Sequence, residues 1–377
     1  MIHMGEDTYL SNVCDEAIGL LMTYQCNLNC KYCYIHTKKS EAMSLDMAKS
    51  IIEPFLLKNQ GLLNIAFMGG ETLLAIDVIK PLVEWAEKGN WRRRFRFFGS
   101  TNGTLLNDDL KLWLTEHKES IRLGLSYDGL PSSQVNNRGD DAIDIDFFLK
   151  TWPKQAIQMT INRETVSKMA DGIIYLLKKG AKVHPNVAFE SSQWTQKNLS
   201  EYARQLNKLI DFYSDNEEYP LISQFIHNLN EYAYNIDNPI TEIEVCGMGH
   251  GFKVFDVDGS SYPCHILSPL VLNEDKVRAI NEIVNNDSNN IDDRCQGCPY
   301  ITTCPTCAAC NFVYRNNLNR RDYTHCHIMR LEVKAFIKKE VARLKSKAIL
   351  SSEDAREIDS IKKIVEFNKL QSYSQWE

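Results

Sequence analysis

The chain has 377 residues, enough for one large domain of barrel size or for two domains with separate cores. Its formal net charge is −6 and 24% of its residues are charged, so it lacks the overall basic field that draws proteins to nucleic acid. No stretch approaches the ~18 apolar residues of a membrane-spanning helix, and the N-terminus has no basic segment followed by an apolar core. We therefore expect a soluble, cytoplasmic protein that binds neither nucleic acid nor membranes.

Short apolar runs alternate with amphipathic stretches through the first two thirds of the sequence. This alternation is typical of repeated β-α units around a parallel sheet. The six predicted strands are Ile18–Tyr24, Leu63–Phe67, Phe95–Ser100, Ile121–Tyr127, Ala156–Ile161 and Val183–Phe189. Between the last two, Val166, Met169, Ile173, Ile174 and Leu177 form the apolar face of a predicted helix, which Gly180 is placed to end.

The pattern changes beyond residue 190. A helix is predicted over Leu199–Tyr213, followed by an irregular segment rich in Asn, Tyr and Pro. The cysteine-rich region after residue 240 has little apolar periodicity, so we expect bound metal to stabilise it. After Cys326, apolar residues at helical spacing predict a helix packed on the body of the protein. The predicted domains are therefore residues 1–240, residues 241–330 and a helical tail over residues 331–377.

The chain has twelve cysteines, which is many for a cytoplasmic protein. In a reducing compartment they are expected to be metal ligands or catalytic thiols rather than disulfides. Their distribution supports this interpretation. Three cluster at residues 26 to 33, eight lie between residues 246 and 326, and Cys14 stands alone.

The first cluster, Cys26, Cys30 and Cys33, has the spacing C-x3-C-x2-C and directly follows the first predicted strand. Three thiolates on one loop can bind three irons of a cubane and leave the fourth iron without a protein ligand. Zinc normally takes four ligands, and His36 is the nearby residue that could supply a fourth. Because the loop follows a strand, it is expected at the carboxyl edge of the sheet, where barrel enzymes carry out their chemistry.

This segment resembles the radical S-adenosylmethionine (radical SAM) superfamily. Tyr32 occupies the aromatic position usual before the third cysteine of the motif. Gly69-Gly70-Glu71, at the end of the second strand, matches the motif that holds the amino group of S-adenosylmethionine (AdoMet). Ser126-Tyr127-Asp128-Gly129 after the fourth strand, followed by Asn137-Arg138, resembles the segment whose serine touches the carboxylate of AdoMet. A zinc-binding or purely structural role of the cysteines is the alternative.

The resemblance implies an α/β fold, a partial (β/α)6 TIM barrel with AdoMet across the carboxyl ends of the strands. It also implies a [4Fe-4S] cluster whose electron cleaves AdoMet to a 5′-deoxyadenosyl radical. The implied cofactor-binding residues are Tyr32, Gly69, Gly70, Glu71, Asn102, Ser126, Arg138, Thr160 and Glu190.

The second group of cysteines resembles the SPASM extension, a C-terminal domain that binds two auxiliary [4Fe-4S] clusters. Its candidate ligands are Cys246, Cys264, Cys295, Cys298, Cys304, Cys307, Cys310 and Cys326. The resemblance therefore implies three clusters in the whole chain. It also implies that Cys295, Cys298, Cys304 and Cys326 form one auxiliary site and that Cys246, Cys264 and Cys307 belong to the other.

The spacing of the later cysteines departs from the family pattern, which has three residues between its third and fourth cysteines. Here two residues separate Cys304 from Cys307, and five separate Cys304 from Cys310. Cys310 is then either the fourth ligand of the second auxiliary site or a spare thiol. In the latter case one iron stays open, and a substrate thiol could bind there.

SPASM proteins mostly modify peptides and proteins, so the resemblance implies a peptide maturase. The predicted reaction is hydrogen abstraction followed by an oxidative crosslink, thioether or carbon–carbon, in a ribosomally made precursor peptide. An external electron donor of the flavodoxin or ferredoxin type is implied. Only 25 residues precede Cys26. Leader recognition is therefore expected elsewhere in this chain or in a separate leader-binding protein.

Three alternatives to crosslinking stay open. Sulfatase-maturating relatives carry a catalytic aspartate just after the cysteine matching Cys264, whereas this chain has His265. Formylglycine formation is therefore less favoured, and it is the runner-up together with radical dehydrogenation of a small substrate. A binding or regulatory module that keeps its clusters without turnover is the third alternative.

Overall fold

The structure is a computed structural model that describes residues 16–35, 38–59, 61–189, 194–243, 246, 248, 251–287 and 291–370. The chain divides into two compact units. The first comprises Met1–Ser192 and Cys246–Asn286, and the second comprises Gln193–Val245 and Asp287–Glu377. Within the described residues, no helix is long and apolar enough to cross a membrane.

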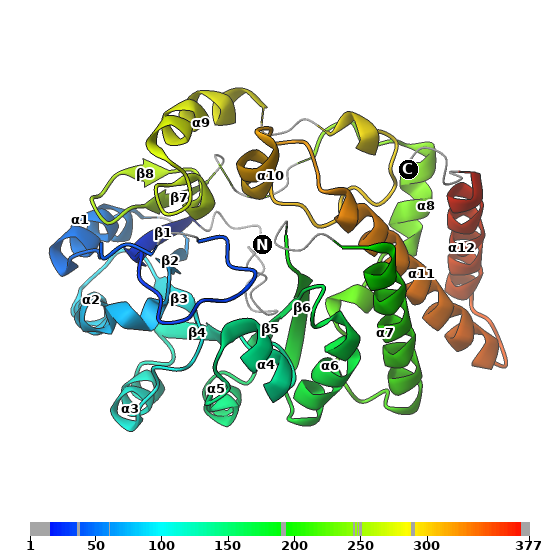
Figure 1. The fold of residues 1–377 in the computed structure, drawn as a ribbon, viewed down its shortest axis with the longest axis horizontal. Helices are drawn as coiled ribbons and strands as arrows, with labels where there is room; N and C mark the ends of the chain where they lie inside the picture. Colours follow the sequence, from blue (N-terminus) through cyan, green and yellow to red (C-terminus); the bar gives the residue numbers. More distant parts are fainter. Residues whose placement is uncertain are drawn as a thin grey trace. The chain divides into compact units, whose positions relative to one another are not determined.

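The first unit is built on parallel strands (Figure 1). They are β1 (Glu16–Thr23), β2 (Leu63–Gly69), β3 (Phe95–Thr101), β4 (Ile121–Leu125), β5 (Ala156–Ile161) and β6 (Lys182–Val187). Strands β1 to β4 pair with their sequence neighbours, β5 pairs with β6, and an isolated parallel bridge between Ser126 and Gln158 joins the two sets. The six predicted strands and their parallel order are confirmed, with ends that differ by a few residues.

Helices follow the strands in alternation, which makes the sheet a partial (β/α) barrel. They are α1 (Leu45–Leu56), α2 (Ile76–Lys88), α3 (Asp108–Glu116), α4 (Pro131–Arg138), α5 (Ile145–Thr151) and α6 (Met169–Lys178), with short 3-10 turns η2 (Thr72–Ala75) and η3 (Val166–Lys168). Side-chain caps fix the N-termini of α1 and α3: the Ser44 side chain accepts from the Met47 N–H, and the Asn107 side chain accepts from the Leu110 N–H. After α6, Gly180 has φ +85°, the left-handed conformation that ends many helices.

Two further strands of the first unit were not predicted. β7 (Phe252–Phe255) pairs in parallel with β1, and β8 (Ser261–Tyr262) pairs antiparallel with β7. The main sheet therefore has the order β4-β3-β2-β1-β7-β8. The 3-10 turn η5 (His265–Leu267) and helix α9 (Glu274–Asp287) follow. Residues on both sides of position 240 thus share one sheet, and the predicted domain division at 240 and 330 stays a prediction.

An apolar cluster lies where β1, β2 and β7 meet. It contains Leu21, Tyr24, Ile35, Ala66, Met68, Val254 and Leu270, and Cys33 and Tyr34 pack against it. Burying one such aliphatic side chain stabilises a fold by about 1.5–3 kcal/mol. The cluster therefore holds the segment around Cys33 against the sheet.

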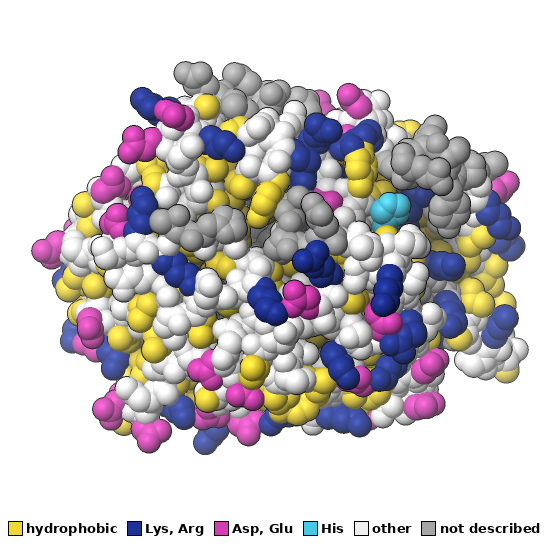
Figure 2. Space-filling model, viewed as in Figure 1, with side chains coloured by type: hydrophobic (Ala, Val, Ile, Leu, Met, Phe, Trp, Pro, Cys, Tyr) yellow, Lys and Arg dark blue, Asp and Glu magenta, His cyan; other side chains and the backbone are white. Residues whose placement is uncertain are grey.

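The second unit is mainly helical. Its helices are α7 (Gln196–Asp215), α8 (Leu229–Asp237), α10 (Ala308–Arg315), α11 (Tyr323–Ser346) and α12 (Ser352–Leu370), with 3-10 turns η4 (Ser223–Phe225) and η6 (Asp293–Cys295). α7 packs on α11 and α8 packs on α12 (Figure 1). The helices predicted over Leu199–Tyr213 and after Cys326 are confirmed, whereas α8 and α10 were not predicted. In the view of Figure 2, basic and acidic side chains are interspersed on the surface.

Candidate active site

The loop that follows β1 carries Cys26, Cys30 and Cys33, all partly buried. Its start runs against the end of β2: the Gly70 N–H donates to the Thr23 carbonyl (2.9 Å) and the Glu71 N–H donates to the Gln25 carbonyl (2.8 Å).

Only glycine fits this contact between the two chain segments. A Cβ on Gly69 would lie 2.1 Å from the Thr23 oxygen, and one on Gly70 would lie 1.9 Å from the Gln25 oxygen. Gly69 also has φ +135°, which side chains disfavour. The Gly-Gly pair therefore lets β2 approach the entrance of the cysteine loop.

Glu71 ties the end of β2 to the end of β3. Its buried carboxylate accepts from the Thr101 hydroxyl (2.6 Å), the Asn102 N–H (2.8 Å) and the Leu73 N–H (3.0 Å). Burial raises the pKa of Glu71, and these hydrogen bonds oppose that rise. The Asn102 amide in turn donates to Asn27 of the cysteine loop (2.9 Å). The side chain of Glu71 thus organises the loop ends around the cysteines.

Asp128, at the end of β4, is the centre of a buried hydrogen-bond network. Its carboxylate accepts from the Tyr32 hydroxyl (2.6 Å), the Asn137 amide (3.0 Å), the Arg138 guanidinium (3.1 Å) and the Thr160 N–H (3.0 Å). The Arg138 guanidinium carbon lies 5.4 Å from the centre of the Tyr32 ring. One carboxylate therefore joins the cysteine loop, helix α4 and strand β5.

Most of the predicted cofactor residues thus lie at one edge of the sheet, and Ser126 joins them there, since its N–H donates to the Thr101 carbonyl (2.9 Å). Glu190 lies outside the described residues. Asp128 was quoted as part of a motif but not predicted to be a site residue. Its contacts with Tyr32 and Thr160 span 96 and 32 residues of sequence, so the local pattern held no signal for them.

The three thiols of the loop lie within electrostatic reach of one another. Burial raises the pKa of Cys30 to about 11; Arg138 opposes the rise, and the Cys33 and Cys26 thiols add to it. Burial also raises the pKa of Cys26. The Nε of Arg138 is buried and has no hydrogen-bond partner in the described part of the chain. A buried cationic donor beside thiols suits an anionic group such as a thiolate-bound cluster or a carboxylate.

No three His, Cys, Asp or Glu side chains among the described residues converge tightly enough to bind a single metal ion. In an iron–sulfur cubane each thiolate binds a different iron, so its ligands stand further apart than those of one ion. Three thiols on one loop with a buried arginine therefore fit a cubane better than zinc.

A second group of thiols lies in the second unit: Cys295, Cys298, Cys304 and Cys326. Burial raises the pKa of Cys304 to about 12, Arg321 opposes this, and the other three thiols add to it. Arg321 donates to the Cys304 carbonyl (3.4 Å), and its buried Nη2 has no hydrogen-bond partner in the residues that the structure describes. These four thiols beside a buried arginine also fit a cubane.

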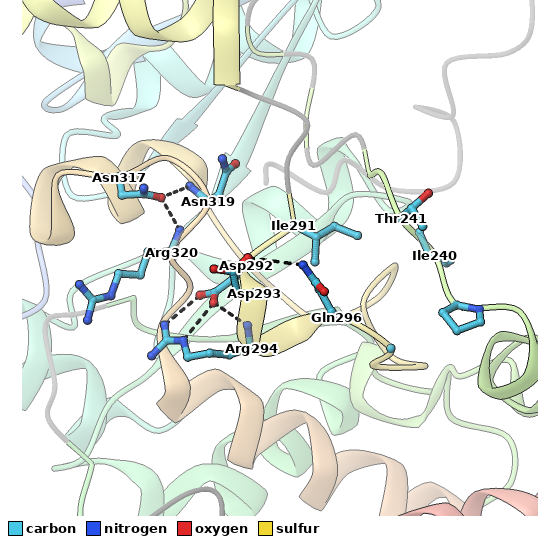
Figure 3. A pocket seen from close by; sticks show the side chains of 12 residues that line it. Ile240, Thr241, Ile291, Asp292, Asp293, Arg294, Gln296, Asn317, Asn319 and Arg320 are labelled. Atoms are coloured by element: carbon cyan, nitrogen blue, oxygen red, sulfur yellow. Dashed lines mark hydrogen bonds and ion pairs between the residues drawn. The ribbon is translucent and has the colours of Figure 1, made fainter.

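The segments around these cysteines line a pocket of about 980 Å³ (Figure 3). Its lining combines polar and apolar surface and comprises Pro239, Ile240, Thr241, Ile291, Asp292, Asp293, Arg294, Gln296, Gly297, Asn317, Asn319 and Arg320. Buried Asp292 accepts from the Arg294 guanidinium (2.8 and 2.9 Å) and from the Arg321 N–H (2.9 Å). The segments before Cys295 and before α11 are thereby held together.

Cys307 and Cys310 lie at the start of α10. The Cys307 sulfur accepts from the Cys310 N–H (3.5 Å) and caps the helix. A hydrogen bond from the Cys310 thiol lowers the pKa of Cys307, and Cys310 is buried. Cys246 and Cys264 lie in the first unit. The distribution of these four cysteines between ligand sites stays a prediction.

His265, next to Cys264, has two partners in the first unit. Its Nδ1 lies 3.7 Å from the Cys264 sulfur, and its Nε2 lies 2.9 Å from the Tyr34 hydroxyl. Burial lowers the pKa of His265 to about 4. The sequence singled out His265 only as a departure from sulfatase-maturating relatives, because Tyr34 lies 231 residues away along the chain.

Residues 20–188 match the family model described as the Radical SAM superfamily. The chain carries a radical SAM domain. A [4Fe-4S] cluster and AdoMet are the cofactors of this superfamily of enzymes. The cysteine loop and the glycine contact lie at the carboxyl ends of β1 and β2 in this domain.

Among curated relatives, an uncharacterized protein of Methanocaldococcus jannaschii is 27% identical over 205 residues, covering 50% of this chain and 70% of its own length. The radical SAM cyclopropyl synthase TigE of Paramaledivibacter caminithermalis is 26% identical over 146 residues. That alignment covers 34% of this chain and only 30% of TigE.

Two solved structures share the fold of this chain over most of its length. anSMEcpe with bound AdoMet is 20% identical, with a TM-score of 0.63 and coverage of 92% of this chain and 98% of that one. SuiB of Streptococcus suis, bound to its precursor peptide SuiA, is 14% identical, with a TM-score of 0.53 and coverage of 82% and 75%.

Proposed function

We propose that the chain is a radical SAM peptide maturase that installs an oxidative crosslink, thioether or carbon–carbon, in a ribosomally made precursor peptide. The observation that carries this proposal is the fold shared with SuiB over 82% of the chain, because SuiB holds a precursor peptide. A structure of anSMEcpe likewise holds a peptide together with AdoMet. The likeness extends beyond residues 20–188 into the cysteine-rich part.

The residues of the loop after β1 have distinct roles in this proposal. Cys26, Cys30 and Cys33 hold the cluster, and the glycine contact keeps their loop at the edge of the sheet. When bound and reduced, the cluster and AdoMet supply a 5′-deoxyadenosyl radical that abstracts hydrogen from the substrate. The proposed contacts to AdoMet come from the edge residues Gly69, Gly70, Glu71, Asn102, Ser126, Arg138 and Thr160.

Arg138 has the clearest electrostatic role. Asp128 neutralises the buried guanidinium and fixes its orientation, while the buried Nε has no hydrogen-bond partner among the described residues. A carboxylate of AdoMet would satisfy that donor with a charge-assisted hydrogen bond. Tyr32 shares Asp128 with Arg138, so the cysteine loop and the proposed carboxylate contact are held by the same group.

Two auxiliary [4Fe-4S] clusters complete the proposal, which brings the total to three. Cys295, Cys298, Cys304 and Cys326 hold one of them, supported by their mutual proximity and by Arg321. Cys246, Cys264 and Cys307, with or without Cys310, hold the other, an assignment that rests on the resemblance to the SPASM extension. Crosslinking removes electrons from the peptide, and the auxiliary clusters are suited to accept them. The first electron comes from a flavodoxin or ferredoxin, and the leader is recognised elsewhere in this chain or by a separate protein.

The test is an anaerobic reaction of the reconstituted, reduced protein with AdoMet and a short precursor peptide encoded beside its gene. We expect 5′-deoxyadenosine and a peptide that has lost two hydrogens per crosslink, detected by mass spectrometry with fragmentation. A variant with Cys26, Cys30 and Cys33 replaced by Ala should give neither. An unchanged precursor, together with conversion of a sulfatase-derived peptide to formylglycine, would replace this proposal by the runner-up.

A further inference from the structure

The His265 ring lies between the hydroxyl of Tyr34 and the sulfur of Cys264. Its Nε2 lies 2.9 Å from the hydroxyl of Tyr34, which directly follows Cys33, and its Nδ1 lies 3.7 Å from the Cys264 sulfur. The Tyr34 and His265 ring centres are 5.7 Å apart, with the rings tilted by 56°. All these residues belong to the first unit.

Packing holds both rings in this arrangement. Tyr34 packs on the apolar cluster formed by Leu21, Val254, Leu270 and their neighbours. His265 begins the turn η5, in which the Ser268 hydroxyl donates to the His265 carbonyl (2.7 Å) and the Leu267 N–H donates to the Cys264 carbonyl (3.0 Å). Leu267 and Ser268 are fully buried. The contact is therefore built into the fold of the first unit.

The chemistry of a metal-bound cysteine fixes the direction of the two hydrogen bonds. A thiolate can accept a hydrogen bond but cannot donate one, so Nδ1 of His265 must carry the proton that points at Cys264. With that proton on Nδ1, Nε2 can accept a hydrogen bond from the Tyr34 hydroxyl, 2.9 Å away. Tyr34 thus selects the tautomer of His265, as outer partners of ligands commonly do.

We propose that His265 donates a hydrogen bond from Nδ1 to the Cys264 thiolate, with Tyr34 fixing the tautomer, and that this pair sets the reduction potential of the cluster that Cys264 ligates. An N–H donor to sulfur withdraws charge from the cluster and favours its reduced, more negative state. The pair therefore raises the potential, which makes the cluster a better electron acceptor. The proposal rests on the proposed function in one respect only, the role of Cys264 as a ligand.

The test is an EPR-monitored redox titration of the complete reconstituted protein without peptide. The signal of the first cluster is identified because it changes when AdoMet is added. The remaining signals then give the midpoint potentials of the auxiliary clusters. His265→Phe removes both hydrogen bonds, and His265→Asn keeps an N–H near the position of Nδ1. We expect the Phe variant to lower one auxiliary midpoint and leave the other unchanged, and the Asn variant to restore most of the shift.

Tyr34→Phe should lower the same midpoint by a smaller amount, whereas Tyr234→Phe, at an exposed tyrosine of α8, should change nothing. Equal midpoints in His265→Phe and the parent, or equal shifts in the Phe and Asn variants, would overturn the proposal. If His265→Phe fails to fold, the Asn and Tyr34→Phe titrations decide. A Cys264→Ala variant with full iron content would instead show that Cys264 is not a ligand. That result would contradict the proposed function, and it is separate from the midpoint potentials that test the role of His265.

Discussion

Replacing Gly70 by Ala tests how β2 positions the cysteine loop. The added Cβ would lie 1.9 Å from the Gln25 oxygen and 2.5 Å from the Gln25 carbonyl carbon. Both are backbone atoms that no side-chain rotation can move, so the chain entering the cysteine loop must shift. The shift breaks the hydrogen bonds from Gly70 to Thr23 and from Glu71 to Gln25.

The cost follows from these contacts. Forcing one methyl group into a packed site costs about 1–3 kcal/mol. Each lost backbone hydrogen bond costs about 1 kcal/mol. Gly70→Ala should therefore lower the free energy of unfolding by about 3–5 kcal/mol, a large fraction of the roughly 5–15 kcal/mol typical of a folded domain. Because Cys26 moves with Gln25, cluster content and AdoMet cleavage should fall as well.

The assay combines urea unfolding, iron content and 5′-deoxyadenosine formation for the Gly70 variant. Gly124→Ala on β4 is the matched control, because its Cβ would lie 3.3 Å from the end of the flexible Gln155 side chain and 3.7 Å, an ordinary contact distance, from the Gly99 carbonyl oxygen. The control should stay within about 1 kcal/mol of the parent and keep its iron. A Gly70→Ala protein with the stability, iron and cleavage of the control would show that the contact does not position the cysteines.

Asp128→Asn leaves the buried Arg138 without its counter-charge, so we expect a loss of about 3–5 kcal/mol in unfolding free energy and weaker AdoMet binding; an unchanged melting temperature and Kd would contradict this. Glu332 is buried and accepts a hydrogen bond from Tyr202. Burial raises the pKa of Glu332 from 4.5 to about 7. The stability that the protonated carboxyl contributes is therefore fully present below about pH 4.5 and is lost as the pH rises through 7. Relative to Glu332→Gln, the parent should therefore lose about 3 kcal/mol of stability over that range in urea titrations, and parallel pH profiles would refute the shift. Cys304→Ala should lose the iron of one auxiliary cluster and keep 5′-deoxyadenosine formation, and full iron content would remove Cys304 from the ligands.

Much of the first unit could be predicted from sequence because its signals are local. The runs at Leu63–Phe67 and Ala156–Ile161 are apolar enough to be buried strands, and their order along the chain implies parallel pairing. β7 could not be predicted, because it has four residues and pairs with β1 more than 230 positions earlier. Its position beside β1 depends on tertiary packing rather than on a periodic pattern.

The candidate site likewise contains residues that a local motif predicts and contacts that only the structure reveals. Gly69 and Gly70 were predicted from their motif, but their physical reason, the close approach of the Thr23 and Gln25 carbonyls, needs the structure. The motif predicted that Glu71 contacts AdoMet. It did not predict the three hydrogen bonds that the Glu71 carboxylate accepts within the protein. Asp128 was missed as a site residue because its partners come from the cysteine loop, α4 and β5.

The most direct test of the central claim is anaerobic formation of 5′-deoxyadenosine from AdoMet by the reconstituted, dithionite-reduced protein. The parent should produce it, and the variant with Cys26, Cys30 and Cys33 all replaced by Ala should not, while the auxiliary iron remains bound. If the triple variant still forms 5′-deoxyadenosine, or the fully loaded parent forms none, this loop does not hold the cluster of a working radical SAM enzyme.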